Sequence, residues 1–205
     1  MFCILLAAYP LSRTSKQFPK RSIFMWILVF CMLFNGGTVP WYITMKGYGL
    51  VDSIWGLVLG MGLNVYNLIL AVNFFKNLPA ELEEAALVDG AEPWKCLVLI
   101  FIPLAKPVIA TIALFTIVQY WNEFFRGMVL SARQSNYPLQ TYIQQLVVTY
   151  DFSTMNVEQI AQVQKLNKQS LDAAKIVVAM IPVLAVYPFL QKYFVSGITL
   201  GSIKG

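Results

Sequence analysis

The sequence predicts an all-α protein, a polytopic bundle of membrane-spanning helices, and two observations support this. Hydrophobic residues make up 58% of the 205 residues and charged residues only 12%, whereas soluble domains carry about 25% charged residues. The apolar residues also gather in runs about 20 residues long, which is the length that crosses a hydrocarbon core of about 30 Å.

Four full spans follow from these runs, at about residues 23–43, 54–75, 108–130 and 174–194. Residues 1–12 are also apolar, but they are too few to cross a bilayer alone. We therefore expect this first segment to be a partial span, the end of a helix whose beginning is missing.

The orientation of the spans is predicted from the distribution of Lys and Arg, because cytoplasmic loops carry an excess of both. Residues 13–22 hold a cluster of four basic residues, so this segment is expected to be cytoplasmic. Alternating the spans then places residues 76–107 in the cytoplasm and residues 131–173 outside the cell.

The cytoplasmic loop 76–107 is unusually polar for this chain, with six charged residues between positions 81 and 95. Asn77 is expected to cap a helix that begins near Pro79, a residue suited to a first helical turn. Gly90 is placed to end that helix in a left-handed conformation, and Pro93 to begin another. An ordinary solvated loop is the alternative interpretation, and the residue spacing decides against it.

The spacing in this loop resembles the EAA signature of permease subunits from binding-protein-dependent ABC importers. That pattern is an EAA triplet, three residues, a glycine, nine residues and then I-x-L-P, and here Ile102 stands where leucine is usual. Residues 121–130 and 187–205 further resemble the carbohydrate branch, in particular oligosaccharide permeases of the maltose type. The signature residues, which the resemblance implies contact the ATPase, are Glu84, Ala85, Ala86, Gly90 and Pro103.

The resemblance implies one transmembrane permease domain over residues 1–205 in a bacterial inner membrane, with a coupling loop at 76–107 and an extracytoplasmic segment at 131–173. It implies a second permease subunit, an ABC ATPase dimer and an extracytoplasmic solute-binding protein that delivers a sugar or oligosaccharide. ATP would be bound by the partner subunits, so no cofactor is expected on this chain. Relatives usually have six spans, and we expect this chain to lack the first and much of the second.

Polar residues inside predicted spans are candidates for the substrate path, because such residues are costly in lipid. Aromatic faces beside amides and a carboxylate suit sugars, which offer C–H faces and hydroxyl groups. The alternative is structural, since amides often bond between helices and Glu123 is one helical turn from Arg126. The candidates are Asn64, Asn67, Tyr120, Asn122 and Glu123.

Several other function classes are excluded or disfavoured. The chain has no histidine, no phosphate-binding GxxxxGK[ST] motif and no cysteine pair with disulfide or zinc spacing, so we expect a transport subunit and not an enzyme. The net charge of +5 is explained by cytoplasmic anchoring, so nucleic-acid binding is not expected. Two alternatives stay open: an ABC permease for a non-sugar solute, and an ion-coupled secondary transporter. The latter would explain Glu123 but not the acidic loop.

Overall fold

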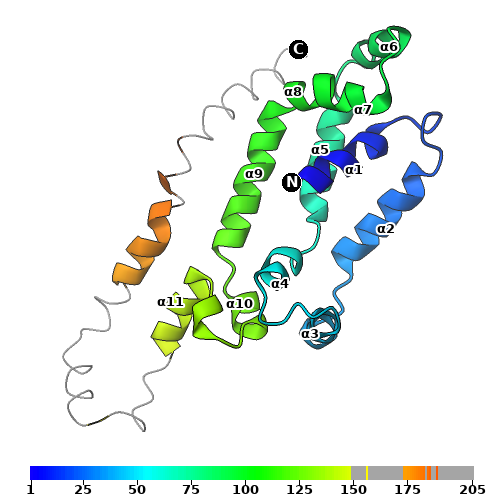
Figure 1. The fold of residues 1–205 in the computed structure, drawn as a ribbon. Helices are drawn as coiled ribbons and strands as arrows, with labels where there is room; N and C mark the ends of the chain where they lie inside the picture. Colours follow the sequence, from blue (N-terminus) through cyan, green and yellow to red (C-terminus); the bar gives the residue numbers. More distant parts are fainter. Residues whose placement is uncertain (149–155, 157–172, 183, 186–187, 189–205) are drawn as a thin grey trace. The chain divides into compact units, whose positions relative to one another are not determined.

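The computed structural model describes residues 1–148, 156, 173–182, 184–185 and 188 (Figure 1). All regular elements in this part of the chain are helical, as the sequence predicts. They are α1 (Phe2–Ser12), α2 (Arg21–Leu33), α3 (Thr38–Gly47), α4 (Ile54–Leu59), α5 (Val65–Lys76), α6 (Ala80–Val88), α7 (Pro93–Cys96), a π-helical turn (Leu97–Phe101), α8 (Ile102–Leu104), α9 (Lys106–Trp121), α10 (Phe125–Leu130), a 3₁₀ turn (Gln134–Asn136), α11 (Leu139–Val148) and the helix Ala173–Pro182.

The predicted spans are broken where the sequence suggests continuous helices. Residues 23–43 fall on α2 and α3, residues 54–75 on α4 and α5, and residues 108–130 on α9 and α10. None of the described helices is long and apolar enough to cross a membrane alone. Two pairs separated by short breaks have the required length and composition, Arg21–Leu33 with Thr38–Gly47 and Pro93–Leu104 with Lys106–Trp121.

The breaks have local causes that the hydropathy pattern does not report. Gly37 lies between α2 and α3 and Gly62 between α4 and α5, and both adopt positive φ angles, 89° and 64°. A helix cannot continue through this conformation. At the third break, the Glu123 carboxylate accepts a hydrogen bond from the backbone N–H of Arg126 (2.8 Å), which starts α10 as a separate helix. The fourth predicted span begins with Ala173–Pro182, and most of its remainder lies outside the described residues.

The chain divides into two compact units. Unit 1 contains the described residues of Met1–Gly37 and Met61–Ile117, and unit 2 contains those of Thr38–Gly60 and Val118–Phe189. The prediction of a single domain over the whole chain stays a prediction.

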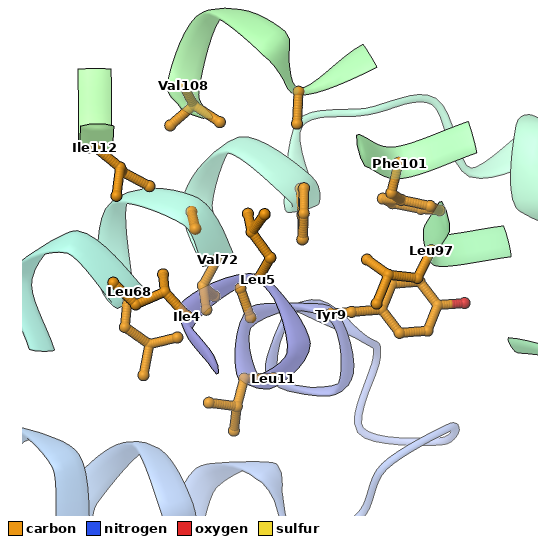
Figure 2. Packing of buried hydrophobic residues seen from close by; sticks show 14 of the residues in the cluster. Ile4, Leu5, Tyr9, Leu11, Leu68, Val72, Leu97, Phe101, Val108 and Ile112 are labelled. Carbon is orange, nitrogen blue, oxygen red and sulfur yellow. The ribbon is translucent and has the colours of Figure 1, made fainter. Parts of the chain in front are cut away.

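The core of unit 1 forms where α1 packs against α5 (Figure 1). Ala8 on α1 and Ala71 on α5 are fully buried, and their small side chains let the two helices approach closely. Larger apolar side chains from the π-helical turn and α9 complete this core (Figure 2). By contrast, α2 has no buried residue although it is apolar almost throughout, and only Met25 and Leu28 pack partly against this core.

Unit 2 is held by close backbone approach and by loop hydrogen bonds. Gly127 on α10 lies directly against Thr141 of α11, whose hydroxyl donates to the backbone carbonyl of Phe124 (2.8 Å). The Asp52 carboxylate accepts hydrogen bonds from the Asn136 side chain (2.9 Å) and the Ala132 N–H (3.2 Å). The segment before α4 is thereby fastened to the segment after α10.

Candidate functional site

The acidic helix α6 begins after Pro79, and Asn77, the residue predicted to cap it, instead ends α5. At the end of α5, the Asn77 N–H donates to the backbone carbonyl of Phe74 (3.1 Å). Pro79 occupies the N-cap position of α6 and makes no side-chain cap hydrogen bond. The predicted Asn77 cap is therefore wrong by two residues. Glu81 and Glu83 lie in the first turn of α6, where the helix dipole favours negative charge.

Gly90 ends α6 as the sequence predicts. It adopts a φ of +80°, its N–H donates to the Leu87 carbonyl (3.1 Å), and the Ala91 N–H donates to the Ala86 carbonyl (2.9 Å). These two bonds make a Schellman motif, which satisfies carbonyls that would otherwise lack partners at the helix end. Pro93 then opens α7, also as predicted. The turn between α6 and α7 therefore has a defined geometry.

The α6–α7 turn presents a mixed polar and apolar surface. Glu84 and Ala85 are exposed, whereas Ala86 packs partly against the core of unit 1. Val88 is 88% exposed and Trp94 62% exposed, so two apolar side chains flank the turn at Gly90. Sequence reasoning missed both of them. The signal that could have identified them is the presence of an apolar residue in a charged loop that lies outside every predicted span.

Glu83, unlike its exposed neighbour Glu84, is buried, with only 6% of its surface exposed. Its carboxylate accepts a hydrogen bond from the Tyr9 hydroxyl (2.6 Å) and forms an ion pair with Arg13. The Arg13 guanidinium also lies 4.6 Å from the centre of the Tyr9 ring and 4.5 Å from that of Phe101. We call Tyr9, Arg13 and Glu83 the buried triad. Glu83 is 70 positions from Arg13 and 74 from Tyr9 in the sequence, so local spacing gives no signal for the triad.

A cavity of about 300 Å³ lies beside the buried triad, with Arg13, Lys76, Glu83 and Glu84 in its wall. Burial, reinforced by the neighbouring charge of Arg21, lowers the pKa of Lys76. The two consecutive glutamates of α6 thus reach the same cavity, one inside the triad and one at the exposed surface.

The predicted substrate-path residues of unit 1 have local structural roles. The Asn64 side chain caps α5 by accepting from the Asn67 N–H (3.1 Å). Asn67 is 1% exposed, and its side-chain amide donates to the Thr116 hydroxyl (3.4 Å) while its carbonyl oxygen has no hydrogen-bond partner. These observations match the structural alternative, hydrogen bonding between helices, and leave substrate contact untested.

The predicted substrate-path residues of unit 2 lie at the end of α9 and the start of α10. The Tyr120 hydroxyl donates to the Val58 carbonyl (2.8 Å), and Asn122 is exposed. Glu123 forms an ion pair with Arg126, as the alternative interpretation expects. The Arg126 guanidinium lies 6.0 Å from the ring centre of Trp41, a residue that sequence reasoning did not select. Aromatic rings, an amide and a charged pair are thus close together in unit 2.

Comparison with known proteins gives a family match, two similar sequences and a similar solved structure. Residues 6–200 match the family model described as "Binding-protein-dependent transport system inner membrane component". The chain is 40% identical to Protein LplC of Bacillus subtilis, over all of this chain and 68% of the relative. It is also 40% identical to the polygalacturonan/rhamnogalacturonan transport system permease protein YtcP of Bacillus subtilis, over all of this chain and 71% of the relative.

The fold of this chain is also similar to that of a solved structure. A crystal structure of a bacterial ABC transporter involved in the import of the acidic polysaccharide alginate matches 94% of this chain and 68% of its own chain. The TM-score is 0.82 and the sequence identity is 36%.

Proposed function

The chain belongs to the family of binding-protein-dependent transport system inner membrane components, and we propose on this premise that it is a membrane-spanning subunit of an ATP-driven saccharide importer. It forms half of the translocation path together with a second permease subunit. Two ABC ATPase subunits bind at the cytoplasmic side, and an extracytoplasmic binding protein delivers the substrate. The broken helices assemble into a multi-pass bundle of four spans and a partial one.

The α6–α7 turn is the observation that carries the coupling role. Its backbone geometry is fixed by the Schellman motif at Gly90, while Glu84 and Ala85 are exposed on α6. The exposed Val88 and Trp94 add apolar area to the same surface. Buried aromatic anchors with a polar rim are typical of interfaces between proteins. We therefore propose that this surface binds in a groove of the ATPase. Pro103 lies in α8, where the chain leads from this surface back to α9.

The substrate class we propose is an acidic oligosaccharide. Support comes from two similar proteins, one named for the transport of polygalacturonan and rhamnogalacturonan and one described as importing alginate. Both kinds of polymer contain uronic acids, whose carboxylates need a basic partner. We assign this role to Arg126, whose guanidinium lies 6.0 Å from the ring centre of Trp41 in unit 2. Asn122 is the first path residue to test because it is exposed, and Asn67 the last because it is buried.

The coupling role predicts that Gly90→Pro abolishes ATPase docking. Proline fixes φ near −65° and has no N–H, so the variant cannot adopt the +80° angle or donate to the Leu87 carbonyl. Glu84→Lys reverses the charge of the exposed signature glutamate. We expect binding-protein-stimulated ATP turnover to fall at least about tenfold in both variants, equivalent to about 1.4 kcal/mol of docking free energy. Turnover is measured in the reconstituted complex.

Lys46→Glu provides a matched charge reversal at an exposed residue of α3, far along the chain from α6, and is expected to leave turnover unchanged. Wild-type turnover in Gly90→Pro and Glu84→Lys would remove the proposed coupling role. Uptake that follows a proton or sodium gradient instead of ATP would favour an ion-coupled secondary transporter.

The substrate assignment is tested by competition. Oligogalacturonate and oligoalginate should inhibit uptake of a labelled acidic oligosaccharide, whereas neutral maltooligosaccharides and amino acids should not. Asn122→Ala should raise the substrate concentration needed for half-maximal uptake while ATP hydrolysis stays normal. Inhibition by the neutral sugars alone would move the assignment to a neutral saccharide, and inhibition by amino acids alone to a non-sugar solute.

A further inference from the structure

The buried triad is the main attachment of α6 to the rest of unit 1. The structure describes every residue of α6, and among them Glu83 alone is buried. Ala86 adds a partial apolar contact, and the remaining side chains of the helix are exposed. A surface helix normally packs through an apolar stripe, whereas α6 is fastened mainly by one carboxylate.

A carboxylate in this position requires compensation, because burying an unpaired charge is costly. The Tyr9 hydroxyl and the Arg13 guanidinium supply it. The guanidinium is held in turn by the rings of Tyr9 and Phe101, both within 5 Å of its central carbon. Such buried pairs add little net stability over an apolar contact of the same shape. Unlike an apolar contact, a hydrogen-bonded ion pair depends on the direction of its groups, so the triad restricts how α6 rotates about its axis.

The rotation of α6 decides which residues face a partner. Consecutive residues on a helix point about 100° apart, because 3.6 residues make one turn. With Glu83 directed inward, Glu84 and Ala85 are directed outward, as their exposure confirms. A roll of the helix about its axis would change the direction in which Glu84 and Ala85 face. Glu83 therefore sets the orientation in which its neighbours are presented.

The triad also connects α6 to two other parts of unit 1. The Tyr9 ring on α1 packs edge-on against Phe101 of the π-helical turn, with ring centres 5.1 Å apart (Figure 2). Phe101 makes a second edge-on contact with Phe75 at the end of α5, at 5.4 Å. A displacement of α6 therefore acts directly on α1 and, through the aromatic contacts, on the chain that leads into α9.

We propose that Glu83 is a positioning residue that transmits movement of α6 to α1 through Arg13 and Tyr9, so that ATP hydrolysis is converted into transport. This inference rests on the proposed coupling function and extends it. Glu84 lies on the surface that binds the ATPase, whereas Glu83 lies in the contact that transmits the movement of α6 to α1. The two adjacent glutamates thus have separate tasks.

The test uses Glu83→Gln in the complete transporter in proteoliposomes. Glutamine keeps the length of the side chain and an acceptor for Tyr9, but it loses the charge that pairs with Arg13. We expect the ATPase subunits to remain bound and ATP hydrolysis to continue, while the amount of substrate imported per ATP falls about fivefold to tenfold, a size typical of altered coupling. Glu81→Gln, an exposed residue of the same helix turn, is the matched control and should leave the ratio unchanged.

A second variant separates positioning from simple stability. The double substitution Arg13→Met with Glu83→Met replaces the ion pair by apolar side chains, which restores packing but not directionality. We expect a normally assembled complex whose import per ATP stays low. A wild-type ratio in the double variant, or in Glu83→Gln, would overturn the inference.

The outcomes for Glu83 and Glu84 are distinguishable. If the proposed ATPase coupling is wrong, Glu84→Lys leaves ATPase binding intact and uptake does not depend on ATP. If only the inference is wrong, Glu84→Lys still loses ATPase stimulation while Glu83→Gln imports as much substrate per ATP as the wild type.

Discussion

Two glutamate–arginine pairs illustrate how differently the two units are held. In unit 1, the side chains of Arg13 and Glu83 are 13% and 8% exposed, and 70 residues separate them in the sequence. In unit 2, the side chains of Arg126 and Glu123 are 26% and 20% exposed, and three residues separate them. The first pair joins the end of α1 to α6, whereas both residues of the second pair lie at the start of α10.

The two pairs therefore constrain different levels of the structure. The Arg13–Glu83 pair can form only when α1 and α6 are already in place, so it fixes tertiary geometry. The Glu123–Arg126 pair forms with the first turn of α10, where Glu123 also accepts from the Arg126 N–H. It therefore fixes where a helix begins.

The largest effect is expected for Arg13→Ala, which leaves Glu83 buried without its counter-charge. Removing one partner of a buried ion pair costs about 3–5 kcal/mol. The free energy of unfolding in detergent, measured by denaturant titration, should fall by that amount. The Arg13→Met and Glu83→Met double variant should recover most of it. A loss below about 1 kcal/mol in Arg13→Ala would mean that the pair behaves like an exposed one.

An intermediate effect is expected for Gly127→Ala in unit 2. A Cβ at Gly127 would overlap the Thr141 hydroxyl and lie 2.7 Å from Cδ of Pro138. Overpacking of this kind costs about 1–3 kcal/mol. Gly47→Ala is the matched control, because a Cβ there has no neighbour within 4 Å. Equal unfolding free energies for the two variants would show that α10 and α11 separate easily, and unit 2 would then lack the tight contact that the structure gives it.

The two pairs also show what the sequence reveals. The Glu123–Arg126 pair and the Gly90 cap were predictable, because each depends on neighbours within one helical turn. The composition likewise predicted helices throughout, and the EAA spacing predicted the family. The buried triad was not predictable, because nothing local distinguishes Glu83 from Glu81 or Glu84. The helix breaks were missed for a related reason: hydropathy averages over about 20 residues, and single residues such as Gly62 and Glu123 cause the breaks.

A smaller effect is expected for Glu123→Gln. Glutamine still offers an oxygen to the Arg126 N–H and loses only the charge interaction, which contributes about 0.2–1 kcal/mol when partly exposed. The unfolding titration used for Arg13→Ala should therefore show a loss below about 1 kcal/mol. A loss equal to that of Arg13→Ala would mean that the Glu123 pair holds tertiary structure as well, and the contrast between the units would disappear.

The smallest effect is expected for Asn136→Ala, which removes a donor from the Asp52 carboxylate. The Asn136 hydrogen bond, followed by the Ala132 N–H and the charge of Arg133, holds the pKa of Asp52 below its ordinary value of 3.8. A depressed pKa stabilises the folded state above 3.8, and that stabilisation is lost as the pH falls below 3.8 through the lowered folded value. The unfolding temperatures of wild type and variant should therefore differ slightly at about pH 7 and converge as the pH falls below 3.8. A constant difference would assign the contact to neutral packing, leaving unit 2 without a charge-dependent link between its loops.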